Sequence, residues 1–114
     1  MARPITRDEL AAKIDRGDAF ILVEALGPMY YEDAHLPAAV NVPHDQVDEL
    51  APSLLPDLDT EIVTYCASTT CQNSDIAARR LEALGYTNVR EYVEGKQDWI
   101  EAGLPVERGA GVTA

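Results

Sequence analysis

Apolar and polar positions recur along the chain with two different periods. Strand-like runs cover residues 20–23, 40–42, 62–66 and 89–93, and the first of them is apolar throughout, as in strands that are covered on both faces. Helix-like spacing, with apolar residues three or four positions apart, covers residues 6–17, 74–84 and 96–102, and a shorter helix is expected over residues 45–50. Turn residues predict an irregular segment over residues 25–35 and interruptions at Pro52 and Pro56.

The order of these elements predicts the fold class. Strands and helices that alternate at short spacing imply right-handed crossovers, and therefore an α/β fold built on an open parallel sheet with helices on both faces. Thr6 and Glu9 form a capping-box pattern at the start of the first helix, and Gly17 is expected to end it. The length suits one domain, residues 1–114, with an ordered core of about residues 5–107 and a disordered tail over residues 108–114.

Composition and charge exclude several classes of partner. The formal net charge of -11 argues against binding to nucleic acid, which requires clustered Lys and Arg, and against anchoring to acidic lipid. No apolar stretch approaches the roughly 20 residues of a membrane span, and the N-terminus lacks the apolar region of a signal peptide. A cytoplasmic location is therefore expected. Two cysteines five positions apart suit redox or sulfur chemistry better than a structural disulfide.

Cys66 is the first candidate for a catalytic residue, because it ends a strand-like run just before a short polar loop. The loop consists of Ala67, Ser68, Thr69, Thr70, Cys71, Gln72 and Asn73, and a helix-like run begins at Ser74. Backbone N–H groups at a helix N-terminus stabilise anions and lower a cysteine pKa from about 8.5 to roughly 3.5–7.5. The pattern predicts a thiolate nucleophile at the carboxyl end of a central strand, where ligands bind in open sheets. A buried structural thiol is the alternative.

Three groups of motifs then occur in a fixed order between Thr6 and Val106. They are Leu22-Val23-Glu24 with His35-Leu36-Pro37-Ala38-Ala39-Val40-Asn41-Val42-Pro43; Ile62-Val63-Thr64-Tyr65-Cys66 with Ser74-Asp75-Ile76-Ala77-Ala78 and Leu84-Gly85-Tyr86; and Glu94-Gly95, Trp99 and Ala102-Gly103-Leu104-Pro105-Val106. Each motif alone is weak, but all three in this order make the chain resemble a single-domain rhodanese, a domain of the sulfurtransferase type.

The resemblance implies a two-step persulfide mechanism. Cys66 would take the outer sulfur of a donor such as thiosulfate, release sulfite, and pass the sulfur to a thiol or cyanide acceptor. Backbone N–H groups of residues 67–72 would stabilise the thiolate and the persulfide. The implied partners are a small sulfur-containing anion, a thiol acceptor and, as an alternative, a protein that donates or accepts sulfur; no metal or organic cofactor is required.

The chain departs from the family pattern at several positions. Glu24 stands where Asp is usual, and Ala34 and Ala38 stand where Gly is commoner, which is tolerable unless those positions need a positive φ. Glu94 replaces the first glycine of a pair, which would narrow the approach to the loop. The loop carries no Arg or Lys, so a modest affinity for thiosulfate is expected, and Gln72 occupies the position at which cysteine phosphatases of this fold need Arg.

The sequence leaves alternative interpretations open for several residues and for the function. Cys71 is either an ordinary loop residue or a resolving thiol, and the chain is either an enzyme, a non-enzymatic persulfide carrier or docking module, or a Cys66–Cys71 redox sensor. Glu24 either orients the loop or caps a helix. A hydrogen-bonded structural role is preferred for His35 and a surface or loop position for His44. Tyr30, Tyr31 and Trp99 are expected to be packing groups, and the spacing of the cysteines and histidines does not favour a zinc site.

Overall fold

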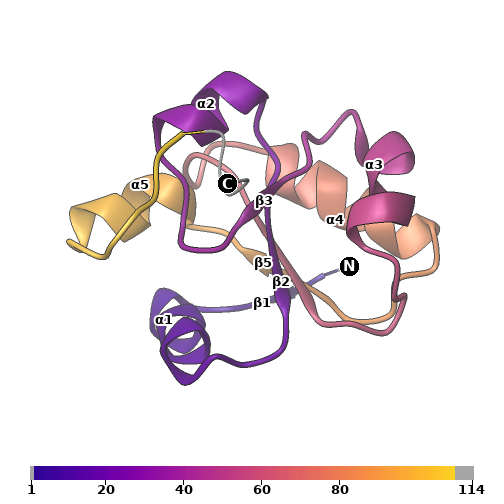
Figure 1. Ribbon diagram of the computed structural model, residues 1–114, viewed down its shortest axis with the longest axis horizontal. Coiled ribbons are helices and arrows are strands. Elements are labelled where there is room, and N and C mark those ends of the chain that lie inside the picture. Colours follow the sequence, from indigo (N-terminus) through magenta and orange to yellow (C-terminus); the bar gives the residue numbers. More distant parts are fainter. Residues whose placement is uncertain (1, 110–114) are drawn as a thin grey trace.

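The computed structural model describes residues 2–109, which form five strands and five helices (Figure 1). The strands are β1 (Arg3–Pro4), β2 (Ile21–Glu24), β3 (Val40–Asn41), β4 (Ile62–Tyr65) and β5 (Val89–Tyr92); the helices are α1 (Arg7–Arg16), α2 (Pro28–Asp33), α3 (Val47–Leu54), α4 (Asn73–Ala83) and α5 (Gly95–Glu101). The strands pair in parallel in the order β1-β5-β4-β2-β3. The predicted open parallel sheet is confirmed, whereas most of the predicted tail, residues 110–114, lies outside the described residues.

Two apolar cores lie on opposite faces of the sheet. On one face, Ile62 of β4 and Val89 of β5 pack with the apolar residues of α3 and α4. On the other face, Val63 and Tyr65 of β4 pack with Trp99 of α5 and residues of α1 and α2. Figure 1 shows α1 and α5 on one side of the strands and α3 and α4 on the other. Because β4 is buried on both faces and lies at the centre of the sheet, the residue that follows it is held firmly at the carboxyl edge.

The ends of α1 follow the predicted local signals. The Thr6 side chain accepts a hydrogen bond from the Glu9 N–H, and the Glu9 carboxylate accepts one from the Thr6 N–H. Gly17 ends the helix with a φ of 70°, a left-handed conformation that glycine adopts without strain.

Two expectations about helices were wrong, and both involve proline. The segment over residues 25–35 is not irregular throughout, because Pro28 begins α2 at a position where no N–H donor is needed. Helix α3 does not end near Leu50 but continues past Pro52 to Leu54. Pro52 is on the exposed side of this short helix, so solvent can hydrate the carbonyl that loses its intrahelical donor, while Val47 and Ala51 remain buried.

Strand β1 was not predicted at all, since it is only two residues long and contains Pro4. It pairs with β5 at the edge of the sheet, where a proline is tolerated because its missing N–H is not needed on the open side. The two alanines that stand where glycine is commoner in the family differ in backbone conformation. Ala34 is extended, whereas Ala38 has a φ of 64°. Ala38 is therefore the position where an alanine is strained, at a cost of about 1–2 kcal/mol.

Within the described residues, none of the helices combines the length and the apolar character that a membrane span needs.

Candidate functional site

Cys66 follows β4 directly and lies at the carboxyl edge of the sheet, as predicted. The residue is only 1% exposed. The thiol donates a hydrogen bond to Ser74 Oγ at 3.3 Å, and its sulfur accepts one from the Ser74 backbone N–H at 3.4 Å. The first turn of α4 therefore contacts the sulfur through a backbone amide and a hydroxyl of the same residue.

Ser74 connects the thiol to a carboxylate on the neighbouring strand. The Ser74 hydroxyl donates its proton to Glu91 Oε2 at 2.7 Å, which leaves its oxygen free to accept from the Cys66 thiol. Glu91 belongs to β5 and is partly buried. The three residues thus form a hydrogen-bonded chain from thiol to hydroxyl to carboxylate. If the proton of the thiol passes along this chain, the Ser74 hydroxyl then donates to the thiolate, and a hydrogen bond to the charged form lowers the pKa of Cys66.

The expected lowering of the Cys66 pKa is wrong for this conformation of the loop. Burial of the thiol, followed by its contact with the Cys71 side chain, raises the pKa of Cys66 to about 11, although the two hydrogen bonds with Ser74 act in the opposite direction. A ring of loop amides was expected around the sulfur. Among the described residues only the Ser74 N–H reaches it, and the Cys71 N–H is instead bound to the Ser68 carbonyl.

The loop residues named from the sequence separate into two groups. Cys71 is half-buried and lies near enough to Cys66 to raise the pKa of that thiol, and both cysteines are free. The remaining loop residues lie at the surface or half-buried: Ala67, Ser68, Thr69, Thr70 and Gln72. Ser68 and Thr70 share a hydrogen bond between their hydroxyls at 3.1 Å, and neither hydroxyl contacts the Cys66 sulfur.

The first turn of α5 holds the start of the loop. The Lys96 N–H donates to the Cys66 carbonyl and the Gln97 N–H to the Ala67 carbonyl, both at 2.8 Å. Gly95 makes this approach possible, because a β-carbon on it would lie 2.6 Å from the Cys66 carbonyl oxygen and its φ is 74°. Both the contact and the backbone conformation require glycine at this position.

Glu24 is fully buried beside this turn and takes neither of its expected roles. Its carboxylate accepts hydrogen bonds from Lys96 Nζ at 3.0 Å and from the Tyr65 hydroxyl at 2.7 Å, and none from the loop or from a helix N-terminus. Burial raises the pKa of Glu24, while Tyr65 and Lys96 act to lower it. Lys96 Nζ also donates to the carbonyls of Tyr30 and Ala34. Glu24 therefore reaches the loop only through Lys96, whose backbone binds Cys66.

Two cavities border the loop and share Ser68, Gln97 and Glu101. One, of about 260 Å³, is also lined by Thr69, Glu94 and Asp98. The other, of about 410 Å³, extends towards α2, where Leu26 and Tyr30 line it, and is also bordered by Ile100 of α5. Tyr30, expected as a packing group, is 63% exposed here, whereas Tyr31 and Trp99 are buried as expected.

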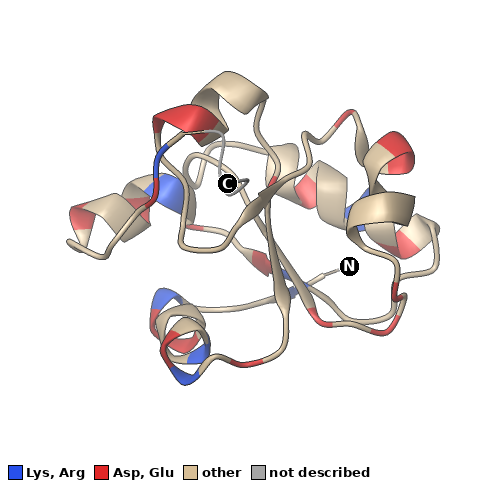
Figure 2. Cartoon of the chain, viewed as in Figure 1, with Lys and Arg blue, Asp and Glu red and all other residues tan. Residues whose placement is uncertain are grey.

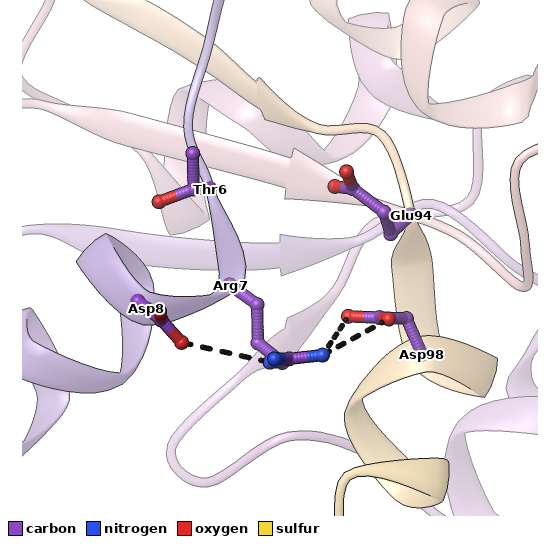
Figure 3. A pocket seen from close by; sticks show the side chains of 5 residues that line it. All are labelled: Thr6, Arg7, Asp8, Glu94 and Asp98. Atoms are coloured by element: carbon purple, nitrogen blue, oxygen red, sulfur yellow. Dashed lines mark hydrogen bonds and ion pairs between the residues drawn. The ribbon is translucent and has the colours of Figure 1, made fainter.

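A third cavity shows which side chains Arg7 pairs with. Figure 3 shows Arg7 of α1 between Asp8 and Asp98, with Glu94 across the cavity. The Arg7 guanidinium lies 3.2 Å from Asp98 Oδ1 and 3.7 Å from Asp8 Oδ1. The positive charge of Arg7 is therefore paired with carboxylates of α1 and α5. Arg7 does not supply the cation that the Cys66 loop lacks.

The histidines and the cysteines do not form a metal site within residues 2–109, where no group of three or more metal-ligating side chains is found. His35 is a buried structural residue, as expected: its ring stacks on Tyr31 and its Nδ1 lies 2.7 Å from the Tyr31 carbonyl oxygen. His44 lies half-buried in the turn before α3.

Comparisons with known proteins identify the family of the chain. Residues 6–102 match the family described as "Rhodanese-like domain". The chain is 33% identical over 108 residues, 95% of its length, to the HTH-type transcriptional regulator Rv0324 of Mycobacterium tuberculosis, of which it spans 46%. It is 30% identical over 94 residues, 73% of its length, to the thiosulfate:glutathione sulfurtransferase of Saccharomyces cerevisiae, of which it spans 66%. The crystal structure of the BH2092 protein from Bacillus halodurans superimposes with a TM-score of 0.87 at 25% identity, covering 99% of this chain and 82% of that one.

Proposed function

Because the chain belongs to the rhodanese-like domain family, we propose that it is a sulfurtransferase that carries a sulfane sulfur on Cys66 as a persulfide. The observation that carries the proposal is the position of Cys66: it follows the central strand and is hydrogen-bonded to the first turn of α4. The yeast relative, named for thiosulfate and glutathione, supports thiosulfate as one donor and a thiol as one acceptor.

The reaction divides into two displacements at sulfur. The Cys66 thiolate attacks the outer sulfur of thiosulfate, the S–S bond of thiosulfate breaks, and the electron pair leaves with sulfite. An acceptor thiolate then attacks the terminal sulfur of the Cys66 persulfide, forms a new persulfide on the acceptor, and releases the Cys66 thiolate. The proton of the Cys66 thiol must leave first, and the hydrogen-bonded chain through Ser74 to Glu91 gives it a path towards a carboxylate.

Intact mass spectrometry tests this proposal. After exposure to thiosulfate, and in parallel to inorganic polysulfide, the protein should gain one sulfur, and peptide mapping should place it on Cys66. Repeated turnover in cyanolysis with thiosulfate would support an enzyme, whereas loading only by a protein desulfurase would support a carrier. If neither donor nor a desulfurase adds sulfur to Cys66, the proposed function is wrong.

A redox function is the second candidate, favoured by the proximity of Cys71, which raises the pKa of the Cys66 thiol. A peroxide would oxidise one thiolate to a sulfenic acid, and the second thiol would displace water from it to form a disulfide. Replacing Cys71 by serine separates the two functions, because it should abolish the disulfide while leaving sulfur loading on Cys66 intact.

The hydroxyl of Ser74 provides a measurable effect on the thiol. Its hydrogen bond lowers the pKa of Cys66, so Ser74→Ala should raise that pKa further and leave a smaller thiolate fraction at any pH below it. We expect alkylation by iodoacetamide between pH 7 and 9 to slow by about three- to tenfold, the effect of one hydrogen bond. Ser68→Ala is the matched control, since the Ser68 hydroxyl bonds Thr70 and not the sulfur. An alkylation profile of Ser74→Ala that coincides with that of Ser68→Ala would contradict the assigned role.

A further inference from the structure

The two cavities beside the loop form one continuous surface, because both are lined by Ser68, Gln97 and Glu101. We call this surface the acidic groove. It is the surface next to the Cys66 loop, since Ala67 and Ser68 line one part and Ser68 and Thr69 the other. Cys66 itself lines neither cavity, so a partner seated in this groove would lie against the loop that covers the sulfur.

The charges that line the acidic groove are mostly negative. Four carboxylates line it, from Asp33, Glu94, Asp98 and Glu101, and Lys96 is its one lining cation. Lys96 is buried and paired with the buried Glu24, so its charge is balanced within the protein.

The four carboxylates differ in how far their charge is compensated. Asp98 is partly neutralised by Arg7 and accepts a hydrogen bond from the Tyr92 hydroxyl. The Glu101 carboxylate accepts only from the neutral amide of Gln97, and the Glu94 carboxylate has no hydrogen bond or ion pair with another described residue. Figure 2 shows acidic residues along α5 and on α2.

The larger cavity of the groove carries exposed apolar side chains from α2 and α5. Tyr30 is 63% exposed and Ile100 is 47% exposed, and both line the larger cavity. Met29, the neighbour of Tyr30 on α2, is 83% exposed. Exposed apolar groups of this size next to a reactive centre are typical of surfaces that bind a polypeptide.

We propose that the acidic groove docks a polypeptide thiol, in which basic residues flank the cysteine next to an apolar side chain, and that this polypeptide exchanges sulfur with Cys66. This inference rests on the proposed function. Glu94 and Glu101 attract the basic residues, and the apolar residue lies against Tyr30 and Ile100. The same carboxylates repel small anionic thiols, so the groove selects its partner by charge as well as by shape.

Peptide acceptors of matched sequence test the proposal. Wild-type protein is loaded with sulfur from polysulfide, and its transfer to three thiols is followed by quenched-flow mass spectrometry. The first thiol is a peptide with cysteine between lysines and one leucine, the second has glutamate in place of each lysine, and the third is glutathione. We expect the basic peptide to react at least about tenfold faster than either of the others at 0.01 M salt, and this advantage should shrink at 0.5 M salt because exposed charges are then screened.

Three double variants identify the surface. Glu94→Gln with Glu101→Gln should remove most of the preference for the basic peptide. Asp45→Asn with Glu49→Gln removes the same charge from exposed positions at α3, on the other face of the sheet, and should leave the preference intact. A third variant, Tyr30→Ser with Ile100→Ser, should slow transfer to the basic peptide more than it slows transfer to glutathione.

The outcomes separate this inference from the proposed function. If Cys66 never accepts sulfur, the proposed function fails. If Cys66 accepts sulfur but passes it equally fast to basic and acidic peptides, or fastest to glutathione, the docking surface is refuted and the sulfurtransferase remains. If both charge variants lose the preference equally, overall charge and not the acidic groove sets it, and the inference is again refuted.

Discussion

Replacing Cys66 by serine is expected to abolish sulfur loading and to reduce thiosulfate turnover by more than about 10³-fold, the scale of loss when a covalent nucleophile is removed. Serine is close in size to cysteine and can keep the hydrogen bond with Ser74, so the variant should fold normally. A hydroxyl oxygen, however, is a far weaker nucleophile towards a sulfane sulfur than a thiolate. The measurement is steady-state cyanolysis combined with intact mass, with circular dichroism as the check on folding.

Cys71→Ser is the matched control for this prediction. Contact with Cys71 raises the pKa of Cys66, so Cys71→Ser should keep sulfur loading and make Cys66 no less reactive. The opposite pattern, with Cys66→Ser still loading sulfur and Cys71→Ser inactive, would move the nucleophile to Cys71. Loss of loading in both variants would indicate that the two thiols act as a pair.

Replacing Lys96 by methionine is expected to destabilise the protein by about 3–5 kcal/mol, because it leaves the carboxylate of Glu24 buried without its cationic partner. Methionine is similar to lysine in length, so lost packing contributes little. The free energy of unfolding, measured by urea denaturation, provides the test. The loss should be larger at pH 8 than at pH 5: without Lys96 the folded-state pKa of Glu24 rises further above its unfolded value, and stability is lost as the pH rises through that window.

Two variants control the Lys96 experiment. Arg80→Ala breaks the exposed pair between Arg80 and Asp48 and should cost no more than about 1 kcal/mol. Adding Glu24→Gln to Lys96→Met should recover part of the lost stability, because the buried charge is then removed as well. A Lys96→Met variant that loses no more stability than Arg80→Ala would show that the buried pair contributes little.

Most of the sheet could be predicted because its signals are local. The apolar run before Glu24 and the run before Cys66 each fix a buried strand, and Thr6, Glu9 and Gly17 mark the ends of α1 within a few residues of sequence. The missed elements depend on context. From the sequence, Pro28 and Pro52 indicate the interruption of a helix, but both are accommodated, Pro28 at the start of α2 and Pro52 on the exposed side of α3. Strand β1 forms because it pairs with the edge of β5.

The site was predictable in position but not in its environment. The sequence places Cys66 at the end of a strand, but the burial of its thiol depends on how the loop folds over it. Glu91 lies in a strand with no signal that separates it from other charged residues, and its contact with Ser74 joins two elements that are distant in sequence. Lys96 looks like a solvated helix residue until β2 places Glu24 beside it.

The contact of α5 with the end of β4 determines which part of the Cys66 loop can change conformation. Amide hydrogens of Lys96 and Gln97 pin the carbonyls of Cys66 and Ala67, and Ser74 is fixed within α4. The Gln72 carbonyl is likewise bound, by the Ile76 N–H of α4, so any rearrangement that brings the sulfur to solvent is confined to residues 68–71, where the Cys71 N–H donates to the Ser68 carbonyl. Such a rearrangement would uncover the Cys66 sulfur while β4 and its neighbouring strands stay in register.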